Sequence, residues 1–467
     1  METGTPFDSL HTPLEGTSLI EASAGTGKTY TLTTLFLRLV VEKGLPVDRI
    51  LVVTFTEAAT AELEGRIRDR LRDALAAFSG GPDRDPFLEE LAAKAGRTEA
   101  ALLRLRQAIR DFDRAAVFTI HGFCRRVLDE HAFESGSPFE TELLPDQTAL
   151  EQGVVEDFWR REMGSASPLF AAFALARGFT PESLLSLARS VRSVLPPHIV
   201  PRETRPETDA VEAGYERAYG RVAEAWPGAR AEVSRLLLDS DALNRVKYRK
   251  DRVAQWIRAM DHHALPGRCD PLLFDGFERF ASSWIEDATK KNRTPPDHSF
   301  FALCEDLLFH RQELTKAFER KLLACRAELF DEVEAELPKW KAERNVQSFD
   351  DLLRGVQAAL RAPGGSRLER ALRSRYGAAL IDEFQDTDSV QYDIFRRVFS
   401  DGTTPLFLIG DPKQAIYGFR GADVFAYMEA AGEISRRLTL PKNYRSEPGL
   451  VRAVNTLFRG HETPFVF

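Results

Sequence analysis

A short glycine-bearing segment between two regular elements constrains the fold of this chain most. Residues 22–29 (ASAGTGKT) follow the apolar run 18–21 and precede a helical pattern over 30–41. Glycines let the backbone curl so that its N–H groups point at phosphate oxygens, and the helix N-terminus adds positive potential. Lys28 should then reach the β- and γ-phosphates of ATP, and the Thr29 hydroxyl should ligate Mg²⁺. The segment predicts a phosphate-binding loop made of Ala22, Ser23, Ala24, Gly25, Thr26, Gly27, Lys28 and Thr29; the alternative is an unliganded strand–helix turn.

Short apolar runs that end in polar clusters recur along the chain. Several of the clusters precede a helical pattern, and this alternation is typical of parallel strands connected by helices. The fold class expected is therefore α/β: a P-loop NTPase core with a doubly wound parallel sheet and ligands at the carboxyl ends of the strands. The runs are 18–21 (SLIE), 50–54 (ILVVT), 116–120 (AVFTI), 378–381 (AALI) and 406–409 (LFLI).

The middle of the chain has a different pattern. Apolar residues recur at three- and four-residue spacing over 147–163, 181–194, 210–238 and 301–340, as in packed helices, with a proline-rich break at 195–206. We expect a large α-helical insertion. The boundaries expected are 1–145 for the first part of the core, 146–345 for the insertion, 346–440 for the second part, and 441–467 for the start of a second core.

Composition excludes some classes of protein. The net charge of −8 argues against a globally basic nucleic-acid coat but leaves a local basic groove open. The four cysteines (Cys124, Cys269, Cys304 and Cys325) are far apart and form no CxxC, which argues against a disulfide scaffold, a zinc ribbon or an iron–sulfur cluster. With no signal peptide and no long apolar run, we expect a soluble protein of the cytoplasm.

An acidic pair follows the apolar run 378–381. Residues 381–386 read IDEFQD, and adjacent carboxylates at the end of a buried strand suit the hydrolysis of a nucleoside triphosphate. Asp382 would hold Mg²⁺, and Glu383 would orient and deprotonate the attacking water. A solvated turn is the alternative, which the phosphate-binding loop upstream makes less favoured.

Two segments near the C-terminus carry further candidates. In 410–423 (GDPKQAIYGFRGAD), Gln414 is placed to sense the γ-phosphate. Tyr417 and Phe419 lie in a glycine-flanked loop and suit stacking on nucleobases, although single aromatics more often pack in a core. In 441–446 (PKNYRS), Arg445 suits a clamp on the γ-phosphate in the transition state.

Two further segments follow predicted strands. In 54–63 (TFTEAATAEL), Phe55 and Thr56 offer an aromatic face to a base and a hydroxyl to a phosphodiester. In 118–124 (FTIHGFC), His121 taken alone suits a structural hydrogen bond. Cys124 is expected to be a buried hydrophobe rather than a nucleophile.

The six segments, in this order and with a helical insertion before DEFQD, resemble superfamily 1 DNA helicases of the UvrD type. LIEASAGTGKTYT, VVTFTEAATAELEGRIR, FTIHGFCRRVL, LIDEFQDTD and IGDPKQAIYGFRGAD are closest to the RecB-type branch, the beta subunits of bacterial exodeoxyribonuclease V. The resemblance implies an ATP-dependent DNA helicase, which moves 3′ to 5′ on single-stranded DNA with ATP between two RecA-like cores. A stand-alone UvrD-like or AddA-like helicase and a non-catalytic ATP- or DNA-binding module remain alternatives.

The resemblance also implies roles for single residues. The insertion would meet duplex DNA, where basic runs at 245–252 (RVKYRKDR) and 290–293 (KKNR) suit phosphates as well as a solvated helix face. Tyr444 would pack on the adenine. The nucleotide site would comprise Lys28, Thr29, Asp382, Glu383, Gln414 and Arg445, and the single strand would contact Phe55, Thr56, His121, Tyr417, Phe419 and Arg420.

Two departures from the family pattern bear on activity. Residues 7–19 contain no glutamine to read adenine, so base selectivity stays open. The chain reaches residue 467 before the rest of a second RecA-like core, which in the family carries a second phosphate-contacting arginine besides the one that Arg445 matches. We therefore expect the N-terminal ATP-binding part of a RecB-like helicase, whose full-length form acts with RecC- and RecD-like subunits. The isolated chain should have little ATPase activity and no unwinding activity, because a missing arginine finger costs about 10³–10⁵ in rate.

Overall fold

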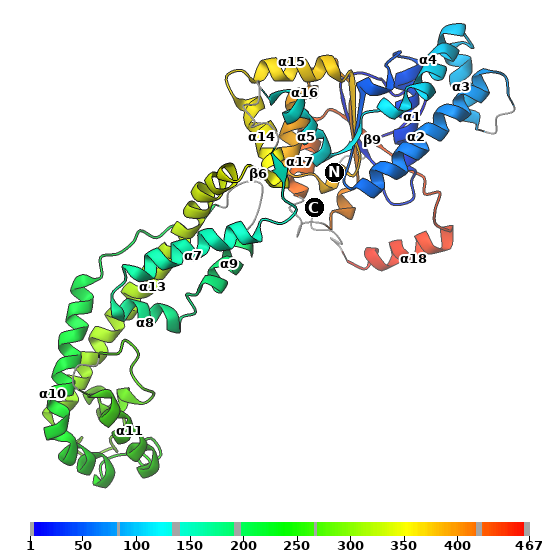
Figure 1. Ribbon diagram of the computed structural model, residues 1–467. Helices are drawn as coiled ribbons and strands as arrows, with labels where there is room; N and C mark the ends of the chain where they lie inside the picture. The colour runs from blue at the N-terminus through cyan, green and yellow to red at the C-terminus, as the bar shows by residue number, and fades with distance from the viewer. Residues whose placement is uncertain are drawn as a thin grey trace. The chain divides into compact units, whose positions relative to one another are not determined.

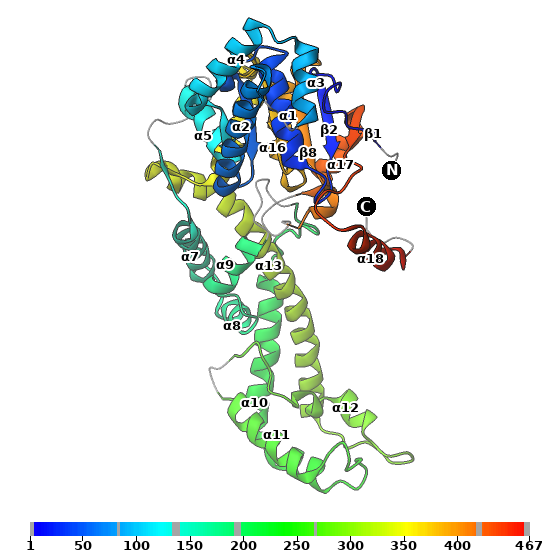
Figure 2. The same cartoon turned by 90° about the vertical axis from the view of Figure 1, so that its right-hand side faces the viewer.

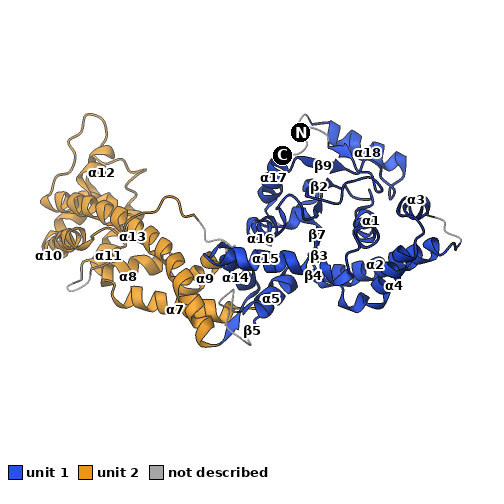
Figure 3. Cartoon of the chain, turned by 90° about the horizontal axis from the view of Figure 1, so that it is seen from above, with its two compact units in different colours: residues 1–145, 193–195, 345–467 blue, residues 146–192, 196–344 orange. Residues whose placement is uncertain are grey.

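The computed structural model describes residues 4–81, 85–132, 141–190, 198–265, 269–416 and 423–461. The chain divides into two compact units, coloured separately in Figure 3. The first, here called the α/β unit, comprises Met1–Pro145, Ser193–Leu195 and Asn345–Phe467. The second, here called the helical unit, comprises Asp146–Arg192 and Pro196–Arg344.

A parallel sheet forms the centre of the α/β unit (Figure 1). In the described part of the chain it has seven strands in the order β1-β9-β2-β8-β7-β3-β4, and every pairing is parallel. The predicted α/β class is therefore confirmed. The strands are β1 (Thr5–Pro6), β2 (Thr17–Glu21), β3 (Ile50–Thr54), β4 (Val117–Thr119), β7 (Ala378–Ile381), β8 (Leu406–Gly410) and β9 (Arg436–Thr439).

The register of the strands brings their carboxyl ends to one edge. Glu21 at the end of β2 pairs with Gly410 at the end of β8, and Thr54 at the end of β3 pairs with Thr119 at the end of β4. The loops that follow these strands therefore lie along the same edge of the sheet. Such edges are where doubly wound proteins bind ligands.

Helices cover both faces of the sheet because alternate strand residues point to opposite sides. Along β3, Ile50 and Val52 pack with one set of helices, and Leu51 and Val53 pack with the other. The first set is α1 (Lys28–Val41), α2 (Glu57–Phe78), α3 (Pro86–Ala95) and α4 (Glu99–Arg110). The second set is α5 (Ile120–Glu130), α14 (Phe349–Arg361), α15 (Gly365–Arg375), α16 (Ser389–Phe399) and α17 (Val424–Glu433).

Side-chain caps define where several of these helices begin. Thr119 accepts a hydrogen bond from the backbone N–H of Gly122, so α5 begins at Ile120 and β4 is shorter than the predicted run 116–120. The remaining elements of this unit are β5 (Glu142–Leu143), β6 (Val346–Gln347), α18 (Pro448–Arg459) and the 3-10 helices η1 (Val47–Arg49), η2 (Phe112–Arg114), η4 (Phe384–Asp386) and η5 (Pro412–Gln414).

The helical unit has an apolar core of its own. Two long helices, α10 (Asp209–Asp239) and α13 (Ser299–Glu343), run side by side (Figure 2), and the Trp226 ring lies 5.2 Å from the Phe300 ring. The other elements are α7 (Thr148–Gly164), α8 (Pro168–Ala176), α9 (Pro181–Ser190), α11 (Lys250–His263), α12 (Ser282–Asp287) and η3 (Phe277–Phe280). Helices α7, α9, α10 and α13 lie where the sequence predicts helices, whereas α8, α11 and α12 are additional. Among the residues that the structure describes, none of the helices is both long enough and apolar enough to span a membrane.

Candidate functional site

The glycine-bearing loop connects β2 to α1 at the carboxyl edge of the sheet. Gly25 and Gly27 have φ values of 77° and 95°, which favour glycine, and Gly27 is the N-cap of α1. No side chain caps this helix, so the N–H groups of its first turn remain available for an anion. Thr26 donates its hydroxyl to the Ser23 carbonyl at 2.7 Å, which closes the loop on itself. The local geometry is that of a phosphate cradle.

The acidic pair lies across from the loop. Asp382 follows β7 directly, and Glu383 has a φ of 48°, a left-handed conformation that is uncommon for a residue with a side chain. Lys28 Nζ, at the first position of α1, donates a hydrogen bond to Glu383 Oε2. The structure thus brings the predicted phosphate-binding lysine and the predicted general base into direct contact.

The site holds more negative charge than its own lysine compensates. Burial raises the pKa of Asp382 to about 6, and the Glu383 charge adds to the shift while Lys28 opposes it. Burial and Glu383 raise the pKa of Asp386 to about 6 in the same way. Asp382 Oδ1 and Asp386 Oδ1 are buried without a hydrogen-bond partner. Asp382 lines the same cavity as Thr29, and a carboxylate and a hydroxyl oxygen are the hard ligands that Mg²⁺ prefers, so these two residues fit a divalent ion.

We expect Asp382→Asn to stabilise the nucleotide-free protein by about 3 kcal/mol at pH 7.5. The folded pKa of about 6 lies above the ordinary value of 3.8, so charging Asp382 costs the folded state free energy. Stability should fall as the pH rises from about 4 through 6, and the variant should lose the part of this dependence that comes from Asp382 while Asp386 keeps its own. The measurement is urea unfolding at several pH values.

Asp393→Asn is the matched control with the opposite sign. Asp393 is also buried, but hydrogen bonds from Gln357 and Arg361 outweigh burial and lower its pKa. Its replacement should therefore destabilise the protein. Destabilisation by Asp382→Asn of the same size would show that Asp382 is not strained by burial.

A cavity of about 370 Å³ joins the loop, the acidic pair and the segment after β9. Asn443 Nδ2 donates to the Ala24 carbonyl at 3.1 Å, and the Tyr444 N–H donates to the Gly25 carbonyl at 2.8 Å. The segment is thereby fastened to the loop, while the Tyr444 side chain is 77% exposed. The lining residues are Ser23, Ala24, Gly25, Gly27, Lys28, Thr29, Tyr30, Arg66, Asp382, Glu383, Gln414, Tyr444 and Arg445.

Most of the residues predicted for the nucleotide site line this cavity. Ala22 and Thr26 shape the loop but do not line the cavity. Tyr30, Arg66 and the anchoring Asn443 were not predicted. Tyr30 directly follows the loop and was within reach of sequence reasoning. Arg66 belongs to α2, which carries no nucleotide motif.

We expect Gly25→Ala to weaken nucleotide binding by about tenfold or more. An added Cβ would lie 2.7 Å from Arg445 Cβ and 2.8 Å from Asn443 Oδ1, so the anchored segment would have to move, and φ would be strained as well. Titration calorimetry with MgATP measures the effect. Gly27→Ala is the control for strain alone, because its nearest neighbour would be Tyr30 Cβ at 3.8 Å. Equal losses in both variants would show that the clash with the anchored segment is unimportant.

Three of the predicted DNA-contacting residues, Phe55, Thr56 and His121, follow the carboxyl ends of β3 and β4 and do not line the cavity. The Thr56 hydroxyl caps α2 by accepting a hydrogen bond from the Ala59 N–H at 3.1 Å. The His121 ring contacts the Phe349 ring edge to face at 5.1 Å, and burial lowers the His121 pKa. Phe55 directly precedes Thr56. Tyr417, Phe419 and Arg420 lie outside the described residues.

The basic runs of the helical unit are largely engaged within that unit. Arg245 donates to the carbonyls of Leu237 and Ser240 and so caps the end of α10, and Lys247 pairs with Asp287 at 2.6 Å. In the second run, Lys290 donates to the Asp241 carbonyl. These contacts favour the structural interpretation of both runs over a phosphate-binding one.

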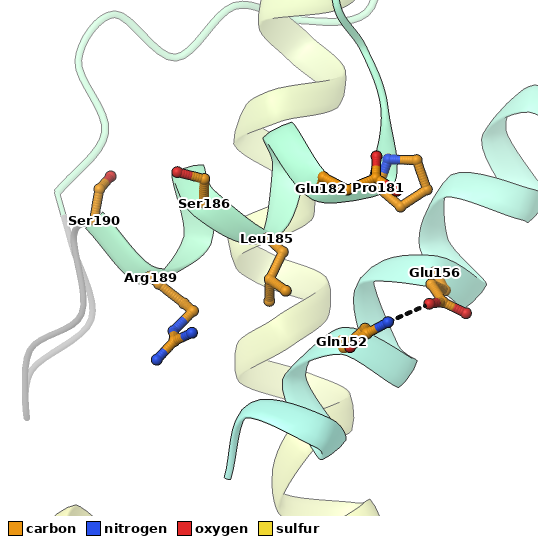
Figure 4. A pocket seen from close by; sticks show the side chains of 8 residues that line it. All are labelled: Gln152, Glu156, Pro181, Glu182, Leu185, Ser186, Arg189 and Ser190. Atoms are coloured by element: carbon orange, nitrogen blue, oxygen red, sulfur yellow. Dashed lines mark hydrogen bonds between the residues drawn. The ribbon is translucent and has the colours of Figure 1, made fainter. Parts of the chain in front are cut away.

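A larger cavity, of about 660 Å³, lies between α7 and α9 in the helical unit (Figure 4). Gln152 of α7 donates to Glu156 at 2.8 Å, and Leu185 and Arg189 of α9 also line the cavity. Its eight lining residues include neither a glycine nor a lysine, so it lacks the groups of a phosphate cradle. The smaller cavity is therefore the candidate site.

The loop between β2 and α1, the acids after β7 on the far side of β8, and the contact of Lys28 with Glu383 are the features of a P-loop nucleotide-binding fold. The family model of the UvrD/REP helicase N-terminal domain matches residues 7–435, so the chain belongs to the UvrD/REP helicase family. The predicted helicase family is thus confirmed. Membership implies the use of ATP together with a divalent metal ion.

Within this family, the chain is similar to subunits that are named RecB. The chain is 38% identical to RecBCD enzyme subunit RecB of Escherichia coli (strain K12), across 99% of this chain and 39% of the relative. It is 36% identical to the subunit of the same name from Haemophilus influenzae, across 99% of this chain and 41% of the relative. The predicted similarity to the RecB-type branch is confirmed, and the chain spans about two fifths of the length of these relatives.

Proposed function

We propose that this chain is the ATP-binding region of the motor of a RecB-like DNA helicase and that it binds ATP with Mg²⁺ in the cavity beside the loop. The observation that carries the proposal is the contact between Lys28 and Glu383 beside Asp382, whose buried Oδ1 has no hydrogen-bond partner. In phosphoryl transfer, a lysine at a helix N-terminus binds the phosphates, whereas acids at a strand end hold the metal ion and position the attacking water. Their meeting in one cavity supports hydrolysis of a nucleoside triphosphate.

Each side chain then has a defined task. Thr29 and Asp382 hold Mg²⁺, which neutralises charge on the phosphates when it is bound. Lys28 exchanges the Glu383 carboxylate for the β- and γ-phosphates, and this exchange frees Glu383 to accept the proton of the attacking water. Gln414, held by Asp411 through a 2.7 Å hydrogen bond, contacts the γ-phosphate.

The exposed segment after β9 completes the proposed site. Arg445 is exposed and lines the cavity, and its guanidinium stabilises the charge that spreads over the γ-phosphate in the transition state. The Tyr444 ring, which is largely exposed, packs on the adenine. In this proposal residues 1–145 and 346–440 form one RecA-like core around the insertion 146–345, and residues 441–467 begin a second core.

DNA binding is proposed for the same edge of the sheet. Phe55, Thr56 and His121 follow β3 and β4 at this edge. Tyr417, Phe419 and Arg420, which lie outside the described residues, belong to the same proposal. Since the relatives are named as subunits of the RecBCD enzyme, we propose that the full-length protein acts on single-stranded and duplex DNA with RecC- and RecD-like subunits in the bacterial cytoplasm. Translocation from 3′ to 5′ and double-strand break repair belong to the same proposal.

The proposed function is tested by binding and by turnover. MgATP should bind to the chain with one site per molecule in titration calorimetry, and a labelled oligodeoxynucleotide should bind in fluorescence anisotropy with an affinity that falls as salt rises. Failure to bind MgATP would contradict the proposal. A second candidate, a binding module without turnover, is favoured by the surface position of Arg445: ATP and DNA binding with no DNA-stimulated hydrolysis would support it.

A further inference from the structure

A buried glutamine connects the acidic pair to the strand beside it. Gln385 belongs to the 3-10 helix η4, directly after Glu383, and its side chain is almost completely buried. It has no place among the cavity lining residues and does not meet the nucleotide site directly. Its amide is nevertheless in contact with three polar groups around that site.

Both ends of the Gln385 amide are engaged. Its Nε2 donates to Glu383 Oε2 at 2.7 Å and lies 3.3 Å from Asp386 Oδ2. Its Oε1 accepts a hydrogen bond from the backbone N–H of Asp411 at 2.9 Å. The reversed amide would place an oxygen against two carboxylates and an NH₂ group against an N–H donor. The orientation is therefore set by its partners.

Asp411 extends the connection to Gln414. Asp411 is 2% exposed, and its Oδ2 accepts a hydrogen bond from Gln414 Nε2 at 2.7 Å. A continuous series of hydrogen bonds therefore runs from Glu383 through Gln385 and Asp411 to Gln414. The series begins at the side chain that faces Lys28 and ends at one that lines the cavity.

The neighbouring glycine makes room for this contact. A Cβ on Gly410 would lie 2.7 Å from Gln385 Oε1 and 2.9 Å from the Gln385 backbone nitrogen. Gly410 has an ordinary backbone conformation in β8, so its small size is required by the close approach of Gln385 and not by its φ. Gly410 and Asp411 thus form one contact with Gln385: the glycine leaves the space, and the Asp411 N–H donates the hydrogen bond.

We propose that Gln385 is a positioning residue that couples Glu383 to Gln414. The inference rests on the proposed function, in which Glu383 accepts a proton and Gln414 contacts the γ-phosphate. When Lys28 leaves Glu383 for the phosphates, the Gln385 N–H still holds the carboxylate. Through Asp411 the same amide holds Gln414, so the general base and the γ-phosphate contact are positioned together.

The test is the ratio of ATP affinity to ADP affinity, because only ATP has the γ-phosphate. Gln385→Met keeps the shape but removes both hydrogen-bonding ends, which leaves the buried Asp411 N–H without its acceptor. We expect the ratio to fall about tenfold, with ADP affinity unchanged, as for the loss of one buried hydrogen bond. Gln414→Ala should lower the ratio to a similar extent. The double variant should be no worse than either single variant, because both changes break one series of contacts.

Gln357→Met is the matched control. Gln357 is also buried in the α/β unit and donates to a carboxylate, that of Asp393, at 3.0 Å, so its replacement has a comparable structural cost. Its affinity ratio should stay within about twofold of wild type, and its effect should add to that of Gln414→Ala. An unchanged ratio in Gln385→Met, or effects of Gln385→Met and Gln414→Ala that add, would reject the coupling. Wild type that binds neither nucleotide would instead reject the proposed function and, with it, this inference.

Amide hydrogen exchange on the wild-type chain tests the coupling without any substitution. The Asp411 N–H is the central donor of the series, so a γ-phosphate contact at Gln414 should slow its exchange. We expect a non-hydrolysable ATP analogue to protect this amide more than ADP does. Equal protection by the two nucleotides at saturation would overturn the proposal.

Discussion

Replacing Glu383 by Gln should slow ATP hydrolysis by about 10²–10⁴-fold, the usual contribution of a general base. The same variant should bind MgATP more tightly than wild type, because two effects favour the phosphates. The neutral amide no longer holds Lys28, which is then free for the phosphates, and it removes one negative charge from a site that already contains Asp382 and Asp386. Tighter binding with lost turnover distinguishes this role from damage to the fold.

Affinity for MgATP is measured by calorimetry on the chain, and hydrolysis is measured by single turnover with labelled ATP and single-stranded DNA, including in the full-length protein. Glu369→Gln is the control, since Glu369 pairs with Arg373 on α15 at 3.3 Å and does not line the cavity. It should leave both quantities unchanged. Weaker MgATP binding by Glu383→Gln, or hydrolysis at the wild-type rate, would contradict the assigned role.

The second large effect is expected from Lys28→Met, which should weaken ATP binding by about 10- to 100-fold, the equivalent of a lost charge-assisted hydrogen bond. Lys28 lies at the N-terminus of α1, and its ammonium group is the cation that contacts Glu383. Without it, the carboxylates of Glu383, Asp382 and Asp386 repel both one another and the phosphates. Calorimetric titration with MgATP gives the loss directly.

Lys94→Met provides the comparison for this prediction. Lys94 also pairs with a glutamate, Glu42, at 3.0 Å in the α/β unit, but it lies outside the cavity lining. Its replacement should change stability slightly and ATP affinity not at all. If Lys28→Met bound ATP as wild type does, the loop would not be the phosphate site.

Several parts of the fold could be predicted from local sequence because they carry a strong pattern. Strands β3 and β8 are short apolar runs buried on both faces, and such runs have few other interpretations. Strands β1 and β9 were not predicted. β9 reads Arg436-Arg-Leu-Thr439, which has no strand pattern by itself, and it becomes a strand because Leu438 pairs with Ile20 of the neighbouring β2.

The residues of the candidate site also divide into those that local sequence predicts and those that only the tertiary structure shows. Lys28, Glu383 and Gln414 were predicted because each lies in a motif whose residue types and spacing suit phosphate chemistry. Arg66 has no such motif: it lies in the middle of α2, where it pairs with Glu62, and only the position of that helix beside the loop makes it line the cavity. Arg245 in the basic run was open to two interpretations, and its contacts with backbone carbonyls favour the structural one.

The sequence by itself determined the class of this protein: a glycine-bearing loop before a helix, an acidic pair after a buried strand and their order along the chain specify an α/β nucleotide-binding core. These features are local, since backbone conformation, strand burial and helix start depend on neighbouring residues. Only the tertiary structure decided that Lys28 contacts Glu383 and that Gln385 connects Glu383 to Asp411. Those contacts join the segments that follow β2, β7 and β8, and their geometry depends on the register of the parallel sheet, which no single segment encodes.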